Sequence, residues 1–370
     1  MMNTLLRIRA WLVAEWLLVI LLGLLPVMLW AVPTPLVNLV DLVDWKTVAA
    51  LAGLMVLSRG LEVSGLIDRL GRKLLDGLRS ERGLAVAIVM FAALLSAVVT
   101  NDVALFVTVP LTLGLARVVD LPVAKLVIFQ ALAVNAGSAV SPVGNPQNLF
   151  LWQRSGAGFL EFTAAMLPIA GAMLVLLIAL VPLGFGKTRL GVKETTDQLP
   201  LRRPLMIVSL AAYPVFLLIV NAGFALIGAV LVIGVFAGAF RQVLRGVDWP
   251  LLLVFVLMFI NLGLLGRLPG VAALASAAMD WPGGPYAFGA VLSQGMSNVP
   301  AAIFLAPFTE DWRALAWGVN VGGFGLAIGS LANLIALRLA RQPGIWWHFH
   351  KWSMLMFGAS LAAGAALLAL

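Results

Sequence analysis

The sequence has 370 residues, of which 62% are hydrophobic and 11% are charged, and its mean hydropathy is +1.06. Because globular domains carry about 25% charged residues, this composition excludes a soluble domain and indicates a polytopic membrane protein. The absence of cysteine excludes disulfides and thiolate metal ligands, and we assign the net charge of +8 to cytoplasmic loops rather than to nucleic-acid binding.

The first elements of the chain are two predicted spanning helices. Residues 11–30 form an apolar run that we take as a retained helix, because Glu15 interrupts it and no small-residue cleavage site follows. A second run, residues 48–67, follows Asp44-Trp45. The basic and amphipathic residues 68–79 are predicted to lie along the cytoplasmic interface.

The next two elements contain polar residues where a membrane helix should be apolar. Residues 83–119 are divided by Thr100-Asn101-Asp102, which predicts a re-entrant hairpin with this triplet at its tip. Residues 121–152 contain VNAGSAVSPVGNPQN (134–148), which predicts a discontinuous helix, because polar backbone at membrane depth must face protein or water. An unbroken helix is predicted at residues 159–185.

The second half repeats this order after a polar linker, residues 186–203. A second hairpin, residues 285–308, has Ser297-Asn298-Val299 at its tip, and a second broken helix, residues 312–339, contains VNVGGFGLAIGSLAN. The two polar stretches align 185 positions apart (135 to 320): Asn135 with Asn320, Gly137 with Gly322, Gly144 with Gly329, and Asn148 with Asn333. Further helices are predicted at residues 204–220, 224–240, 248–265 and 347–370, with a short segment at 270–280.

The distribution of positive charge predicts the topology. With the N-terminus inside, about nine crossings and two hairpins place all but four of the 24 Lys and Arg in the cytoplasm. The odd number of crossings between Asp44-Trp45 and Asp248-Trp249 predicts two inverted repeats, residues 1–185 and 204–370, joined by the linker. The predicted fold is therefore an all-α polytopic membrane protein with two inverted-topology repeats. The four cations predicted to lie outside are Lys46, Arg154, Arg267 and Arg313.

Inverted repeats with broken helices are typical of secondary transporters, whose binding site lies near the bilayer midplane. Half-helix N-termini suit an anion, and freed carbonyls with Asn or Ser side chains suit sodium or a proton. Glycine at the breaks lets the backbone approach a ligand closely. Asp102 is a candidate coupling site, because an ionisable residue at membrane depth is usually functional.

Four blocks of the sequence resemble the ion transporter superfamily, which includes arsenite permeases, citrate and dicarboxylate carriers, and NhaD-type sodium/proton antiporters. The blocks are TNDVALFVTVPLT, ALAVNAGSAVSPVGNPQNLFLW, SNVPAAIFLAP and VNVGGFGLAIGSLANLIALR. The resemblance covers nearly the whole chain and is strongest to the YbiR type of bacterial inner-membrane protein. It implies an inner-membrane location, a scaffold domain with a moving transport domain, a homodimer, and elevator-type alternating access.

In the dicarboxylate branch of that superfamily, both hairpin tips carry Ser-Asn-Thr and bind sodium and a substrate carboxylate. Here Asp102 and Val299 stand where the threonines would be, while Asn101 and Asn298 keep the asparagine. The Asn-Asp pair is closer to what the arsenite and sodium/proton branches carry. An acid at the tip could take and release a coupling proton.

The candidate substrate- and ion-binding residues lie at the two tips and the two breaks. For each there is also a structural alternative, such as a turn cap, an interhelical hydrogen bond or a cap on a half-helix. A sodium ion is expected near Asn101, Asp102 and Asn135. The full set is Thr100, Asn101, Asp102, Asn135, Gly137, Ser138, Ser141, Gly144, Asn145, Asn148, Ser297, Asn298, Asn320, Gly322, Gly323, Gly329 and Asn333.

The sequence therefore predicts a proton- or sodium-coupled secondary transporter of a small anion or oxyacid. The alternatives are a sodium/proton antiporter and an arsenite-type efflux permease. An enzyme is not expected, because the sequence contains neither HExxH nor GxSxG. Arg59 and Glu62 are predicted to form an interfacial ion pair at i, i+3. The expected partners are a small solute or ion, the lipid bilayer and a second copy of the chain, with no cofactor besides the coupling ion.

Overall fold

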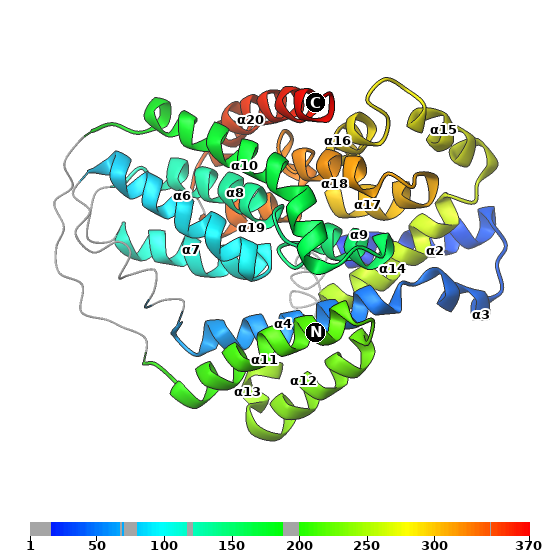
Figure 1. Cartoon of the computed structure of the whole chain (residues 1–370), viewed down its shortest axis with the longest axis horizontal. Coiled ribbons are helices and arrows are strands. Elements are labelled where there is room, and N and C mark those ends of the chain that lie inside the picture. The colour runs from blue at the N-terminus through cyan, green and yellow to red at the C-terminus, as the bar shows by residue number, and fades with distance from the viewer. Residues whose placement is uncertain (1–15, 67–68, 70–79, 117–120, 188–199, 341) are drawn as a thin grey trace, which may run out of the picture.

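The computed structural model describes residues 16–66, 69, 80–116, 121–187, 200–340 and 342–370. Most of the predicted interfacial segment 68–79, most of the linker 186–203 and the start of the helix predicted at 11–30 lie outside the described residues. Within the described part of the chain every regular element is a helix (Figure 1). This agrees with the predicted all-α class.

The first half contains the predicted interruptions. The α6 and α7 helices are separated at Val99 and Thr100, and α8 and α9 are separated by residues 139–145. The helices of this half are α2 (Trp16–Ala31), α3 (Leu36–Leu39), α4 (Trp45–Val63), α6 (Glu81–Val98), α7 (Asn101–Leu115), α8 (Val123–Ser138), α9 (Pro146–Ser155) and α10 (Phe159–Gly184), with the 3₁₀ turn η1 (Val40–Leu42).

The second half is interrupted at the corresponding places. Ser297 separates α16 from α17, and residues 322–330 separate α18 from α19. The helices of this half are α11 (Arg203–Asn221), α12 (Ala225–Ala239), α13 (Arg241–Leu244), α14 (Trp249–Leu265), α15 (Pro269–Met279), α16 (Gly284–Met296), α17 (Asn298–Leu305), α18 (Trp312–Val321), α19 (Leu331–Ala340) and α20 (Ile345–Leu368), with the turns η2 (Ala306–Phe308) and η3 (Ala327–Gly329).

Several of these helices are suited to a membrane. Among the described residues, four helices are long and apolar enough to span one by themselves: α6, α10, α11 and α20. A fifth span results if α14 and α15, which meet at an angle of 93°, are counted together. The remaining apolar helices are shorter, so the nine crossings stay a prediction. Large apolar side chains on the outer faces, such as Leu160 and Leu218, are exposed, as lipid contact requires.

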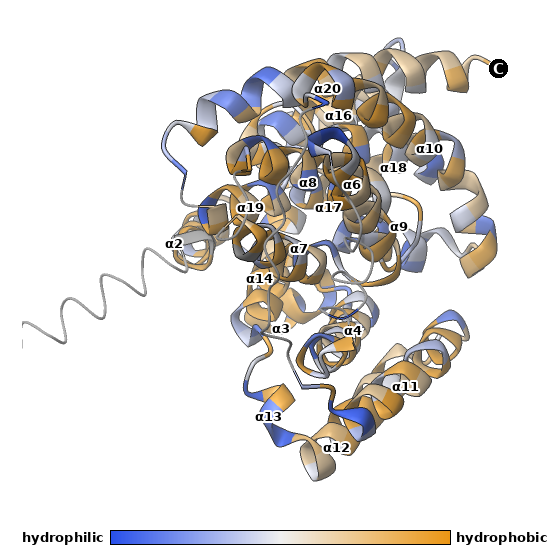
Figure 2. Ribbon diagram, turned by 90° about the vertical axis from the view of Figure 1, so that its left-hand side faces the viewer, coloured by the Kyte–Doolittle hydropathy of each residue, from blue (hydrophilic) through white to orange (hydrophobic). Residues whose placement is uncertain are grey.

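The helices form two groups in space. The scaffold group comprises α2, α4 and α11 to α14, in which α4 packs on α11, α12 and α14. The hairpin group, named after the two hairpins predicted from the sequence, comprises α6 to α10 and α16 to α20, in which α8 contacts α6, α7, α10, α19 and α20. Figure 1 shows the α4, α11 and α12 helices below the hairpin group, and Figure 2 shows hydrophobic residues along α11 and α12. The groups meet where α4 contacts α7 and α9 and where α14 contacts α17.

The repeated Asp-Trp dipeptides begin α4 and α14 in the same way. The side chain of Asp44 accepts a hydrogen bond from the Thr47 amide, and that of Asp248 accepts one from the Leu251 amide, so both cap their helices. Each indole then donates to the carbonyl five residues earlier, Trp45 to Val40 at 3.1 Å and Trp249 to Leu244 at 2.9 Å. The matching sequence therefore produces matching local structure.

Small residues allow the close approach of helices within the hairpin group. Gly137 on α8 lies against α6, and a Cβ at this position would come within 2.1 Å of the Ala93 carbonyl oxygen. Gly318 on α18 lies against α16 in the same manner, since a Cβ there would lie 2.2 Å from the Tyr286 carbonyl oxygen. Neither backbone can withdraw without separating the helices. Glycine is therefore required by packing at both sites.

We expect Gly137→Ala to lower the free energy of unfolding by about 1–3 kcal/mol, the usual penalty of overpacking. Gly171→Ala on α10 is the matched control, because no atom lies within 4 Å of its added methyl group. The control should leave the stability unchanged or raise it slightly, since alanine favours helix. Thermal unfolding of the purified variants in detergent measures both. Equal melting temperatures for the two variants would contradict this account of Gly137.

Candidate functional site

The two broken helices meet at four buried asparagines. The Asn135 side-chain amide donates to Asn333 Oδ1 at 2.8 Å, and the Asn320 amide donates to Asn148 Oδ1 at 2.7 Å. Because Asn135 aligns with Asn320 and Asn148 with Asn333, the second hydrogen bond is the first with the halves exchanged. We call these two hydrogen bonds the asparagine bridge.

A second pair of hydrogen bonds surrounds the asparagine bridge. Ser330 Oγ donates to Asn135 Oδ1 at 3.1 Å, and the Asn145 amide donates to Asn320 Oδ1 at 3.0 Å. Positions 145 and 330 are also equivalent, being 185 residues apart. The Ser330 hydroxyl and the Asn145 amide therefore donate equivalent hydrogen bonds.

The breaks themselves are closed by the same asparagines. The Asn148 amide donates to the Ala139 and Ser141 carbonyls, and the Asn333 amide donates to the Gly323 carbonyl. Asn145 caps α9 by accepting from the Asn148 backbone amide at 2.9 Å. Asn145 is therefore a helix cap, while Asn148 and Asn333 satisfy carbonyl groups that the breaks leave free.

The first hairpin tip is attached to the first break. The Asn101 backbone amide donates to the Gly144 carbonyl at 2.8 Å, and Ser141 Oγ donates to the Ala97 carbonyl at 2.7 Å. Asn101 Oδ1 accepts from the Asp102 backbone amide at 2.9 Å. Ser138 links the break internally by donating to the Asn135 carbonyl at 3.4 Å.

The second hairpin tip has an unusual backbone. Ser297 is the one described non-glycine residue with a positive φ, at 76°, and its hydroxyl lies 3.5 Å from the Gly329 carbonyl. Such a conformation is unfavourable for residues with a side chain and is found preferentially at functional sites. Asn298 is only 2% exposed, yet its side chain forms no hydrogen bond with the described residues; its amide lies near Gly323. Asn298 is therefore a buried amide without a hydrogen-bond partner among the described residues.

A cavity of about 460 Å³, which we call cavity I, begins at the first tip and separates the two helix groups. Asp102 and Arg338 line it from the hairpin group, on α7 and α19. Arg59, Glu62 and Asp248 line it from the scaffold group. Arg59 and Glu62 form the predicted ion pair, with a distance of 2.6 Å. Cavity I thus places Asp102 among four other charged side chains.

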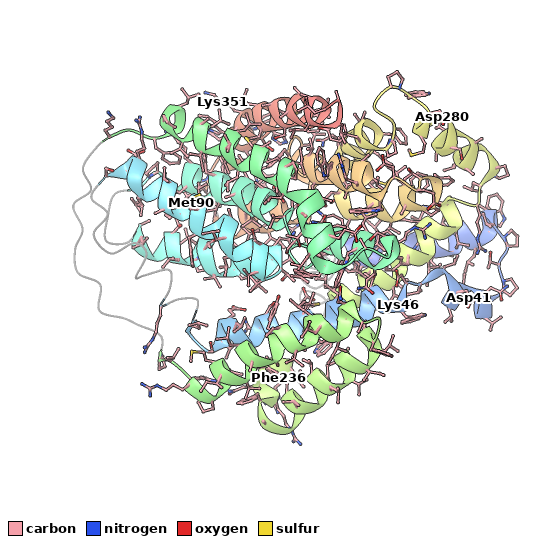
Figure 3. All side chains as sticks on the ribbon, viewed as in Figure 1. Asp41, Lys46, Met90, Phe236, Asp280 and Lys351 are labelled. Atoms are coloured by element: carbon pink, nitrogen blue, oxygen red, sulfur yellow. The ribbon has the colours of Figure 1, made fainter. Side chains whose placement is uncertain are left out.

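A second cavity of about 440 Å³, cavity II, lies at the other end of the contact between α4 and α14. It is lined by residues 41–44 before α4 and by the C-terminal half of α14, whereas cavity I is lined by the C-terminal half of α4 and the N-terminal half of α14. Asp41, Asp44, Arg154 and Arg267 are its charged side chains. Asp41 and Lys46 mark this end of the molecule in Figure 3, opposite the end with Lys351.

The structure separates the predicted site residues into two sets. Asn135, Asn148, Asn320 and Asn333 lie together at the asparagine bridge, with Ser138, Asn145 and the break glycines around them. Thr100 and Asp102 instead face cavity I. No hydrogen bond among the described residues joins Asp102 to Asn135, although both were expected near one sodium ion. Within the same residues no cluster of three His, Asp or Glu could hold a metal.

Some residues of the site were not singled out in the sequence. Gln294 on α16 holds the second break, donating to the Gly322 and Phe324 carbonyls and accepting from the Leu326 amide. A polar residue three positions before the tip was the available signal for it. Asp248 and Arg338 face Asp102 only because distant segments pack together, and no local pattern indicates this.

Comparison with known proteins agrees with the predicted resemblance. Residues 9–322 match the family described as "Citrate transporter". The chain is 46% identical to the inner membrane protein YbiR of Escherichia coli over 329 residues, which covers 88% of each chain. It is also 31% identical to an uncharacterised transporter of Methanocaldococcus jannaschii over 305 residues, covering 81% of this chain and 82% of the relative.

A solved structure has the same fold. The YdaH transporter of Alcanivorax borkumensis, whose crystal structure was described as having an unusual topology, superposes with a TM-score of 0.58. The match covers 96% of this chain and 97% of that one, at 17% sequence identity. The family, these relatives and the apolar helices agree on one class of molecule. The chain is an inner-membrane transporter, not an enzyme, and it belongs to the citrate transporter family.

Proposed function

We propose that the protein is a secondary active transporter of a small anion or oxyacid, driven by protons or sodium and active as a homodimer in the bacterial inner membrane. The observation that most directly supports this proposal is cavity I. It starts at a hairpin tip and lies between two helix groups, so a solute within it contacts both groups. Movement of one group along the other would then carry the solute.

The proposed mechanism is elevator-type alternating access by two inverted repeats, residues 1–185 and 204–370. The reciprocal contacts of the asparagine bridge and the two Asp-Trp caps support a structural relation between the halves. Cavities I and II support the inversion, because they lie at opposite ends of the α4–α14 pair. In this mechanism the hairpin group moves as one body, since the asparagine bridge connects its two broken helices.

Asp102 is the proposed coupling site. Its carboxylate faces cavity I and accepts no hydrogen bond from the described residues, whereas Glu62 pairs with Arg59 and Asp248 caps α14. A proton or a sodium ion at Asp102, with Asn101 beside it, would compensate this charge. Asn298 and Ser297 would contact the solute from the second tip.

A sodium/proton antiporter is the second candidate. The charges of cavity I favour it, because three carboxylates (Glu62, Asp102 and Asp248) stand against two guanidinium groups (Arg59 and Arg338). A net negative cavity attracts cations. The two candidates differ in whether flux requires an anion.

Asp102→Asn should abolish the dependence of solute uptake on an imposed pH or sodium gradient, because an amide neither ionises nor binds sodium with a full charge. Proteoliposome uptake across a panel of citrate, succinate, phosphate, sulfate and arsenite measures this. Asp280→Asn, a change outside both cavities, is the control and should keep coupled uptake. Fully coupled uptake by Asp102→Asn would remove Asp102 as the coupling site, and gradient-driven flux without any anion would favour the antiporter.

Single cysteines at Val103 and Phe308 should be labelled from opposite sides of the membrane. Val103 lines cavity I and Phe308 lines cavity II, both side chains are half-buried, and the natural chain contains no cysteine that would give background. A membrane-impermeant maleimide added to right-side-out and inside-out vesicles provides the measurement. Labelling of both positions from the same side would contradict the inverted arrangement.

Asn320→Ala and Asn298→Ala should have opposite effects on stability and transport. Asn320→Ala removes one acceptor of the Asn145 amide and the donor to Asn148 Oδ1, which costs about 1–3 kcal/mol for each buried group left unsatisfied. Asn298→Ala removes an amide that has no described partner, so the melting temperature should stay near that of the wild type while uptake falls. Thermal unfolding and proteoliposome uptake are measured on the same preparations. A stable, inactive Asn320→Ala would assign solute contact to the asparagine bridge instead.

A further inference from the structure

Each of the two cavities contains two arginines that come from the same kinds of element. In cavity I, Arg338 lies in the last turn of α19, and Arg59 lies in the C-terminal half of α4. In cavity II, Arg154 lies in the last turn of α9, and Arg267 follows the end of α14. Both cavities thus carry one arginine on the second segment of a broken helix, and a second arginine that lies on a scaffold helix (Arg59) or in the turn directly after one (Arg267).

These arginines do not occupy aligned positions of the repeat. The residue equivalent to Arg59 is Gly263 (59 + 204), and the residue equivalent to Arg154 is Leu339 (154 + 185). The paired arrangement is therefore not a simple product of repeated sequence. Positive charge therefore stands at both ends of the molecule at positions that the two repeats do not align.

Three of the four guanidinium groups are unpaired within the described structure. The one ion pair found there joins Arg59 to Glu62. Asp44 and Asp248, which line the cavities, accept hydrogen bonds from helix N-termini instead. Arg154, Arg267 and Arg338 are exposed at the cavity mouths, so their donors can reach a ligand that arrives from solvent.

The location of Arg154 and Arg267 is also unexpected for a membrane protein. They are two of the four cations that the charge distribution places outside, against the bias of Lys and Arg for the cytoplasmic side. Asp41 and Asp44 balance these two arginines in the net charge of cavity II. An anion there is attracted by direct contact with the exposed guanidinium groups, which bind oxygen anions strongly. A role in solute capture accounts for both cations lining the same cavity.

We propose that Arg154 and Arg267 form an anion-collecting vestibule at cavity II, and that Arg338 with Arg59 forms its counterpart at cavity I. The inference rests on the proposed anion transport and narrows the solute to a small molecule with at least one anionic oxygen group, which guanidinium binds in bidentate fashion. The carboxylates set a condition at cavity I: with three acids against two arginines, an anion enters favourably only when a proton or cation neutralises one acid. Asp102, with no described hydrogen bond to its carboxylate, is that acid.

The vestibules are tested by kinetics from each side of the membrane. In right-side-out vesicles, Arg154→Gln and Arg267→Gln should raise KM at least about threefold for the panel anion that the wild type carries, with kcat kept, because each change leaves cavity II with a net negative charge that opposes anion capture. The difference in KM between the variants and the wild type should shrink as ionic strength rises, because salt screens this charge. In inside-out vesicles the same variants should match the wild type, whereas Arg338→Gln should show the raised KM.

Arg313→Gln is the matched control, since Arg313 is also predicted outside but stacks on Trp317 and lines neither cavity. It should leave KM and its salt dependence unchanged, and melting temperatures verify that all variants are folded. Two results would overturn the vestibule while the proposed function stands, provided that the wild type carries an anion. One is an unchanged KM in Arg154→Gln and Arg267→Gln, and the other is an equal rise of KM in Arg313→Gln. If the wild type carries no anion of the panel, the proposed function and the vestibule are both overturned.

Discussion

The asparagine bridge is the contact on which the rest of the structure depends. A helix that is interrupted at membrane depth leaves amide and carbonyl groups that neither lipid nor the helix itself can satisfy. Here the two interrupted helices satisfy each other, through Asn135 with Asn333 and Asn320 with Asn148. The hairpin tips then attach to the breaks, at Gly144 and Gly329. Each polar interruption is therefore possible only because the other is present.

Because the bridge asparagines bond to one another, the residues that hold the structure together differ from those proposed to bind the solute. The amides of the bridge are engaged within the protein, whereas Asn298 and the Asp102 carboxylate remain without described partners. The two tips also differ, because the charged Asp102 faces a cavity, whereas the corresponding Val299 is buried and apolar. The two halves have matching internal hydrogen bonds. They differ in the residues that face the space between the scaffold group and the hairpin group. The proposed coupling chemistry would therefore lie mainly in the first half of an otherwise matched arrangement.

Much of the architecture could be predicted from the sequence, because its signals are local. Thr100-Asn101-Asp102 and residues 134–148 are polar within apolar runs, and the helices end there as expected. The spacing of Arg59 and Glu62 predicted their ion pair correctly. The sequence could not indicate which asparagine bonds to which, since the partners lie 172 and 198 residues apart. For the same reason Asp248, Arg338 and Gln294 were missed: their roles arise from packing between distant segments.

The reciprocal hydrogen bonds also determine when each broken helix can reach its final structure during synthesis. Residues 134–148 are synthesised well before residues 319–333. The amides of the first broken helix therefore lack their final partners until the second broken helix has been made. Contacts of such large sequence separation form late in folding. An early intermediate therefore exposes a polar segment inside the bilayer, where water, lipid headgroups or the insertion machinery must solvate it. The hydrogen bonds of residues 134–148 to the second broken helix can therefore form only after that helix has been synthesised.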